Sequence, residues 1–129
     1  MYKGILIVGL GGFLGSSSRY MLTQLIHRLF ITNFPLGTLL INIIGCFALG
    51  FLLGIFEKGS LISPELWLFL TVGFCGGFTT FSTFSADSLN LINDREILYL
   101  ILYMGLSIFV GISCTFIGKI IGNYIWSLK

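Results

Sequence analysis

The sequence has very few charged residues. Asp, Glu, Lys and Arg make up 9% of its 129 residues, whereas a soluble domain contains about 25%. So few charges cannot cover a water-soluble globule of this size, and 56% of the residues are hydrophobic. The net charge of +2 is too small, and the basic residues are too scattered, to indicate a nucleic-acid partner. We therefore predict an integral membrane protein surrounded by membrane lipid.

Groups of residues that carry catalysis are also missing. The sequence has no carboxylate pair, no paired Cys and His, no metal-ligand cluster and no phosphate-binding loop with its lysine. Cys46, Cys75 and Cys114 stand in three separate apolar segments, which favours small buried side chains over a disulfide or a metal site. The first apolar segment has no small-residue cleavage site, so no cleavable signal peptide is expected. An enzyme is therefore not predicted.

Long apolar segments dominate what is present. We expect one all-α membrane domain over residues 1–129, with helical spans at about 4–26, 36–56, 67–92 and 97–126. Four spans put both termini on the same side of the membrane. Basic residues are then nearly balanced between the two sides: Lys3, Lys58, Lys119 and Lys129 with the termini, and Arg19, Arg28 and Arg95 opposite. The positive-inside rule selects no orientation, so oppositely inserted copies could pair as an inverted dimer.

Polar residues in the first two segments have two interpretations each. Gly11 and Gly15 form a GxxxG pair, which is typical of close helix contact. Arg19 follows in the same segment, either as an interfacial anchor or as a cation that attracts an anion to a pore vestibule. Asn42 lies deep in the second segment, with Thr38 one turn earlier on the same face. Asn42 either hydrogen-bonds between helices or lines a pore as a donor.

The third segment contains the most unusual run of the chain, residues 73–85, where glycines, hydroxyls and phenylalanines are crowded together. At membrane depth such a run is tolerated only where it packs against protein or lines a water-filled path. Its glycines weaken a helix, and the hydroxyls of Thr79 and Thr80 can bond to backbone groups that a broken helix frees. We therefore expect this helix to be broken near residues 76–80.

The polar groups predicted along a path are mainly hydrogen-bond donors. Hydroxyls and amides donate hydrogen bonds, and a phenyl ring carries partial positive charge at its edge. Tyr103, Ser107 and Gly111 recur at intervals of four in the fourth segment, which fits either a packing seam or a hydroxyl track. The candidate donors are Thr38, Asn42, Thr79, Thr80, Ser82, Thr83, Ser85 and Ser107, with the ring edges of Phe81 and Phe84. This chemistry favours a path for an anion or a small solute, and carbonyls freed at the break could hold a cation.

Three motifs run in order along the chain: GGFLG at 11–15 with Arg19 and Tyr20, GTLLIN at 37–42 with Gly45, and GGFTTFSTF at 76–84. With these motifs the sequence resembles the small microbial fluoride channels called Fluc or CrcB. The resemblance implies an antiparallel, dual-topology homodimer with two separate fluoride pores in the bacterial cytoplasmic membrane. Such a channel exports cytoplasmic fluoride passively and confers resistance to it.

The same resemblance implies roles for individual residues. Phe81 and Phe84 would contact fluoride through their ring edges, Asn42 would be the pore asparagine, and Arg19 would belong to the vestibule. A structural sodium ion at the dimer interface would be held by the main-chain carbonyls of Gly76 and Thr79. Tyr103 and Ser107 would form a polar track on the fourth helix. The third track position falls on Gly111, where a hydroxyl is expected, and Asp87 stands where many members have Glu.

Two other functions are compatible with four short membrane helices. A small multidrug-type transporter also forms an inverted dimer, but it requires a mid-membrane carboxylate in its first helix. Residues 4–26 contain neither Asp nor Glu, which counts against that function. A structural membrane subunit would use its glycines and hydroxyls only for helix packing, and it would pass no ions.

Overall fold

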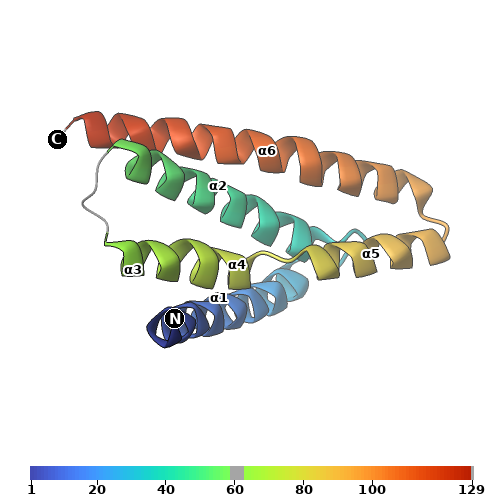
Figure 1. Ribbon diagram of the computed structural model, residues 1–129. Helices are drawn as coiled ribbons and strands as arrows, with labels where there is room; N and C mark the ends of the chain where they lie inside the picture. Colours follow the sequence, from blue (N-terminus) through green and yellow to red (C-terminus); the bar gives the residue numbers. More distant parts are fainter. Residues whose placement is uncertain (59–62, 129) are drawn as a thin grey trace.

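The computed structural model describes residues 1–58 and 63–128, and within these ranges every regular element is a helix (Figure 1). The elements are α1 (Tyr2–Leu29), α2 (Leu36–Lys58), α3 (Pro64–Leu68), the π-helical η1 (Phe69–Cys75), α4 (Gly76–Phe78), α5 (Phe81–Asn93) and α6 (Ile97–Ser127). Segments α3 to α5 continue one another as a single bent span. In the described residues four helices are long and apolar enough to cross a membrane, which confirms the all-α membrane class. Residues 59–62, which fall between the predicted second and third spans, and Lys129, which was counted with the basic residues near the termini, lie outside the described residues.

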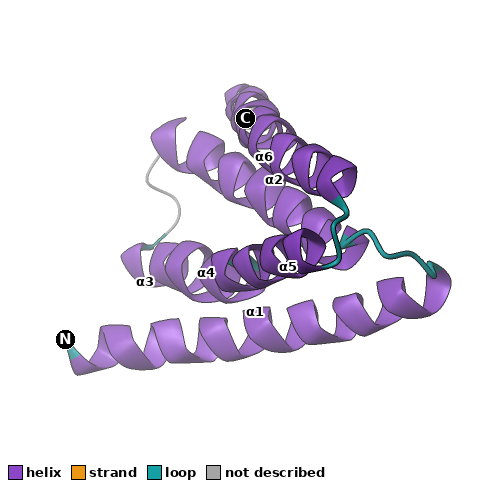
Figure 2. Cartoon of the chain, turned by 90° about the vertical axis from the view of Figure 1, so that its right-hand side faces the viewer, coloured by secondary structure: helices purple, strands orange, loops and turns teal. Residues whose placement is uncertain are grey.

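The helices form two packed pairs. α2 lies along α6, and α1 packs against η1 and α4 (Figure 1, Figure 2). Most large apolar side chains face outward, among them Leu10, Phe109 and Phe116, each more than 60% exposed. This outward apolar surface is expected where the solvent is lipid, because hydrocarbon provides no hydrophobic drive to bury such groups between helices.

Glycines allow both pairs to approach closely. At eight glycines within these pairs, an added Cβ atom would come within 3.0 Å of atoms in the facing segment. The glycines between α2 and α6 are Gly50, Gly54, Gly118 and Gly122, and those between α1 and the η1–α4 stretch are Gly11, Gly15, Gly73 and Gly77. Each set contains pairs spaced four apart, the spacing that puts small residues on one helix face. Of these pairs, only Gly11 and Gly15 were predicted to mediate a close contact.

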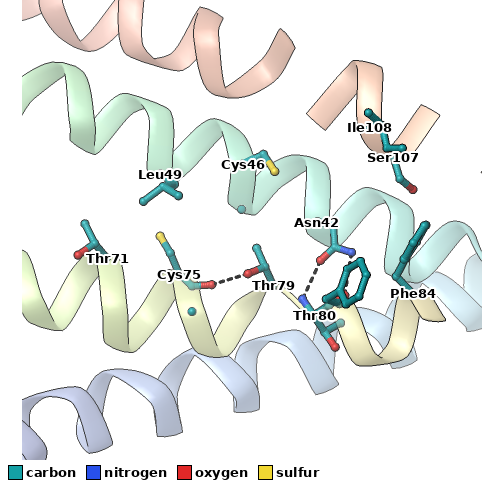
Figure 3. A pocket seen from close by; sticks show the side chains of 13 residues that line it. Asn42, Cys46, Leu49, Thr71, Cys75, Thr79, Thr80, Phe84, Ser107 and Ile108 are labelled. Carbon is teal, nitrogen blue, oxygen red and sulfur yellow. Dashed lines mark hydrogen bonds between the residues drawn. The ribbon is translucent and has the colours of Figure 1, made fainter. Parts of the chain in front are cut away.

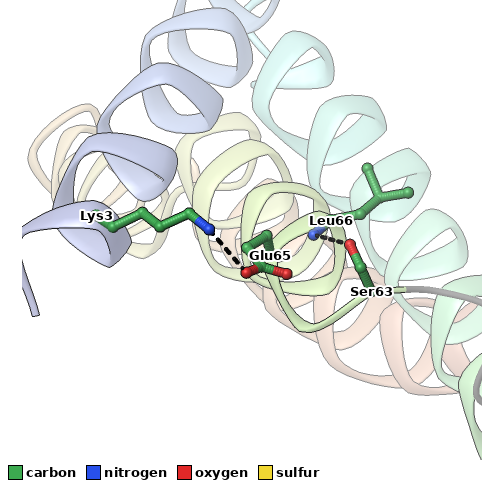
Figure 4. Close-up of polar contacts among 4 residues, drawn as sticks. All are labelled: Lys3, Ser63, Glu65 and Leu66. Atoms are coloured by element: carbon green, nitrogen blue, oxygen red, sulfur yellow. Dashed lines mark hydrogen bonds and ion pairs between the residues drawn. The ribbon is translucent and has the colours of Figure 1, made fainter.

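The start of the third span is fixed by capping and by one ion pair (Figure 4). Ser63 is the N-cap of α3, and its hydroxyl accepts a hydrogen bond from the Leu66 N–H at 3.2 Å. Pro64 follows at the first helical position, where its missing N–H costs nothing. Lys3 Nζ lies 3.0 Å from Glu65 Oε1, so the beginning of α1 is tied to the beginning of α3.

The break in the third span is narrower than predicted. Residues 76–78 are helical as α4, and only Thr79 and Thr80 leave the helical conformation. Thr79 has φ −81° and ψ 159°, and Thr80 has φ −152° and ψ 119°. The glycines therefore do not unwind the chain themselves. Two extended threonines separate α4 from α5, and the reason lies in their contacts with α2.

Candidate functional site

Asn42 of α2 holds the backbone of Thr80 at the break (Figure 3). Its Oδ1 accepts a hydrogen bond from the Thr80 N–H at 2.8 Å, and its Nδ2 donates to the Thr80 carbonyl at 3.1 Å. One side-chain amide therefore replaces both backbone bonds that Thr80 gives up by leaving the helix. Asn42 does make a hydrogen bond between helices, and it also lines a hollow beside the break.

Thr80 also begins the next helix. Its Oγ1 accepts a hydrogen bond from the Thr83 N–H at 3.2 Å, which makes it the N-cap of α5. The same hydroxyl donates to Thr83 Oγ1 at 3.0 Å and lies 3.3 Å from Ser82 Oγ. The predicted hydroxyl-rich run therefore serves first to organise its own helix start. Ser85 is used similarly, since its hydroxyl donates back to the Phe81 carbonyl at 3.0 Å.

The larger hollow beside the break has a volume of about 380 Å³ and lies between α2, the bent span and α6 (Figure 3). Its lining residues are Asn42, Gly45, Cys46, Leu49, Thr71, Cys75, Gly76, Thr79, Thr80, Phe81, Phe84, Ser107 and Ile108. The Ser107 hydroxyl is buried and has no hydrogen-bond partner within residues 1–58 and 63–128. A buried hydroxyl without a partner is costly, so the Ser107 hydroxyl is free to donate to water or to an ion that enters the hollow.

Phe81 and Phe84 both line this hollow, but they differ in their surroundings. Their ring centroids lie 5.6 Å apart with an interplanar angle of 35°. Phe84 also packs against Tyr103, with ring centroids 5.0 Å apart, whereas Phe81 is 78% exposed. Phe84 therefore contributes to packing between α5 and α6, and Phe81 is held by few neighbours.

A smaller hollow of about 230 Å³ lies on the α1 side of the break. Its lining residues are Ser16, Arg19, Tyr20, Thr23, Thr38, Ile41, Thr80 and Thr83. Arg19 Nη1 donates to the Thr79 carbonyl at 3.4 Å, so its guanidinium lies at the break and faces this hollow. The structure therefore places Arg19 beside the break, and its role as a vestibule cation stays a prediction.

The predicted track on α6 is divided by the structure. Tyr103 is completely buried and lines neither hollow, and its hydroxyl donates to Asp87 Oδ2 at 3.1 Å. Ser107 reaches the larger hollow, whereas Ser82 and Ser85 line neither. The pairing of Tyr103 with Asp87 was not predicted. A carboxylate inside an apolar span needs a donor, and that requirement was the signal that could have revealed it.

Two carbonyls at the break are suitable ligands for a cation. In a continuous helix the Gly76 carbonyl would accept from the N–H of Thr80, but that N–H bonds to Asn42 instead. The Thr79 carbonyl lies outside the helices and accepts one long hydrogen bond, from Arg19 at 3.4 Å, and both residues line the larger hollow. Carbonyls of interrupted membrane helices coordinate sodium in other proteins. The donor set therefore fits sodium, although two carbonyls supply only part of its coordination shell.

Among the described residues, the two hollows are lined by hydrogen-bond donors and by no negatively charged side chain. In the part of the chain that the structure describes, neither hollow is lined by Asp or Glu, and Arg19 is the one charged residue that lines either of them. The remaining polar groups are hydroxyls and the Asn42 amide, which can donate to an anion without binding it as tightly as a buried cation would. This chemistry suits the passage of a small anion.

A family model and several individual relatives place this chain in the same protein family. Residues 6–119 match the family model described as "CrcB-like protein, Camphor Resistance (CrcB)". A protein of Chlorobium phaeobacteroides (strain BS1) named "Fluoride-specific ion channel FluC" is 46% identical over 117 residues, covering 91% of each chain. Proteins with the same name from Flavobacterium psychrophilum and Clostridium novyi are 44% and 41% identical, each over 94% of this chain and over 98% and 94% of their own lengths.

Proposed function

The chain belongs to the CrcB-like family, and from this premise we propose that it is a channel that conducts fluoride ions. It is a multi-pass protein of the bacterial cytoplasmic membrane and not an enzyme. In the proposal, fluoride leaves the cytoplasm passively through this channel, which protects the cell from its toxicity. The relatives named as fluoride-specific channels match this chain over almost its whole length, which supports the proposal.

The observation that carries the proposal is the larger hollow at the break. It brings together the Asn42 amide, the rings of Phe81 and Phe84 and the unpaired hydroxyl of Ser107. Fluoride accepts strong hydrogen bonds, and losing its hydration shell requires donors along the whole path. A neutral donor set next to aromatic ring edges meets that requirement and leaves the ion free to move on.

The channel is proposed to be an antiparallel homodimer with two pores. One copy leaves the large aromatic side chain of Phe81 78% exposed beside the hollow, and four helices do not enclose a pore. A second copy inserted in the opposite orientation would cover this face and complete each pore. The near balance of basic residues on the two sides permits insertion in both orientations.

A structural sodium ion is proposed where the broken spans of the two copies meet. The carbonyls of Gly76 and Thr79 would hold it, and the second copy would contribute the same pair. When bound, the ion supplies positive charge that draws these carbonyls together. Removing sodium by exhaustive exchange is expected to lower the thermal stability of the purified dimer. An unchanged stability would argue against an exchangeable sodium site.

The decisive experiment is fluoride efflux from liposomes that contain the purified protein, with chloride efflux as the control. We expect rapid loss of fluoride and retention of chloride. Equal efflux of both anions, or of neither, would contradict a fluoride channel. Labelling from outside intact vesicles tests the dual orientation, with one cysteine introduced near the N-terminus and with Cys46, Cys75 and Cys114 replaced by Ser. About half of the copies should be labelled if the two orientations are equally populated.

A further inference from the structure

The two hollows meet at a single residue. Of the described residues that line them, Thr80 is the one common to both. We propose that Thr80 is the partition across which an anion passes between the hollows, and that its hydroxyl hydrogen is the donor that transfers the ion. This inference rests on the proposed function, because it assigns a step to the same path. In the sequence Thr80 is one of several neighbouring hydroxyl residues, and only its contacts in the structure distinguish it.

The backbone of Thr80 is fixed while its side chain remains adjustable. Asn42 holds both the N–H and the carbonyl of Thr80, at 2.8 Å and 3.1 Å. The residue therefore cannot shift when an ion arrives, because a shift would leave two backbone groups at membrane depth unpaired. Asn42 also lines the larger hollow, so the side chain that holds the Thr80 backbone also offers a donor to an ion in that hollow.

The Thr80 hydroxyl has a hydrogen that can change partner. Its oxygen accepts the Thr83 N–H at 3.2 Å, and this bond caps α5. Its own hydrogen points to Thr83 Oγ1, 3.0 Å away, and Thr83 lines the smaller hollow. Turning that hydrogen toward an anion breaks one neutral hydrogen bond and leaves the cap intact. A hydrogen bond to an ion is stronger than the neutral bond it replaces, so the exchange is favourable.

Both hollows offer an anion hydrogen-bond donors on its way past Thr80. The smaller hollow contributes Arg19 and the hydroxyl of Thr38, and the larger contributes Asn42 and the unpaired Ser107 hydroxyl. Without a donor at Thr80, the ion would cross between these sets with part of its hydration lost and nothing in its place. Thr80 is therefore expected to control the rate of fluoride transfer and its discrimination against chloride, which accepts weaker hydrogen bonds.

The test compares two substitutions at Thr80 with a matched control. Thr80→Val keeps the shape and removes the hydroxyl, and fluoride efflux should fall about tenfold or more because a donor to the ion is lost. Thr80→Ser keeps the hydroxyl and should retain efflux within about threefold of the wild type. Thr115→Val removes a hydroxyl that donates to the Gly111 carbonyl and lines neither hollow, so its efflux should not change. Thermal stability and the fluoride-to-chloride ratio are measured for each protein.

A folded Thr80→Val protein that conducts fluoride as the wild type does would overturn the inference and leave the channel itself established. Wild-type protein without fluoride efflux would overturn both. If Thr80→Val does not fold, Thr80→Cys is made in a background where Cys46, Cys75 and Cys114 are replaced by Ser. Labelling it with a small neutral methanethiosulfonate should block efflux by about tenfold or more, because the label fills the partition. Full efflux after complete labelling would overturn the inference.

Discussion

The seam between α2 and α6 and the break between α4 and α5 both join neighbouring elements, but their chemistry is opposite. At the seam, Gly50 and Gly118 let two intact helices approach until their backbones touch. At the break, Asn42 replaces backbone hydrogen bonds that Thr80 has given up. The glycine contacts at the seam leave the backbone groups within their helices and involve no polar side chain. The break removes backbone groups from the helix and surrounds them with hollows and donors.

This difference suggests separate roles, with the seam contributing to folding stability and the break to ion conduction. A dry contact between glycines provides packing energy and has no group that an ion could use. A broken helix loses local hydrogen bonds, but the residues that compensate for them also line the hollows. We therefore expect changes at the seam to act mainly on folding, and changes at the break to act on flux more than on folding.

The largest expected effect on stability is at the seam. Gly118→Ala would place a methyl group against the backbone of α2, and overpacking of this kind costs about 3 kcal/mol at its upper range. Gly105→Ala on the same helix meets nothing within 4 Å and should be neutral or slightly stabilising. Denaturant titration in detergent measures both. Equal stability of the two variants would show that α2 and α6 do not rely on close contact.

The next largest effect on stability is expected at Asn42, whose amide holds the Thr80 backbone. Asn42→Leu leaves the N–H and carbonyl of Thr80 without partners, which should cost about 2 kcal/mol of stability and reduce fluoride efflux about tenfold or more. Asn90→Leu, at an exposed position of α5, is the control and should change neither quantity. If Asn42→Leu keeps wild-type efflux, the amide has only a structural role and the two regions are more alike than we propose.

Within the break, Phe81 and Phe84 are expected to differ in their contribution to stability. Phe84→Ala removes a ring that packs against Tyr103 and should cost about 2 kcal/mol. Phe81→Ala removes a side chain that is 78% exposed and should cost less than about 0.5 kcal/mol in one copy. Both should reduce fluoride efflux severely if ring edges contact the ion. Wild-type efflux in a folded double variant would reduce the rings to packing residues.

The smallest effect lies outside both regions. Lys3 and Glu65 form an ion pair with side chains that are 77% and 49% exposed, and such pairs contribute little. Lys3→Gln should therefore leave the unfolding midpoint and fluoride efflux unchanged within error. A clear loss of stability would mean that docking of α1 onto α3 is more important than the glycine contacts between α1 and the η1–α4 stretch.

Much of the fold follows from properties that are local in the sequence. Long apolar segments with few charges predict four membrane helices, and the crowded run at 73–85 predicts a break in the third. The sequence also predicts Asn42, Phe81, Phe84 and Ser107 as candidate donors, and the structure brings them to one hollow. Composition and spacing suffice for such predictions because the membrane imposes the same rules on every helix.

By itself, the sequence determined the membrane class, the number of spans and the kinds of donor near the break. Only the tertiary structure decided that the break is confined to Thr79 and Thr80, that Asn42 holds Thr80, and that the Tyr103 hydroxyl donates to Asp87. The physical reason is distance along the chain. Asn42 and Thr80 are 38 residues apart, and their pairing depends on how α2 packs against the bent span, which no local pattern encodes.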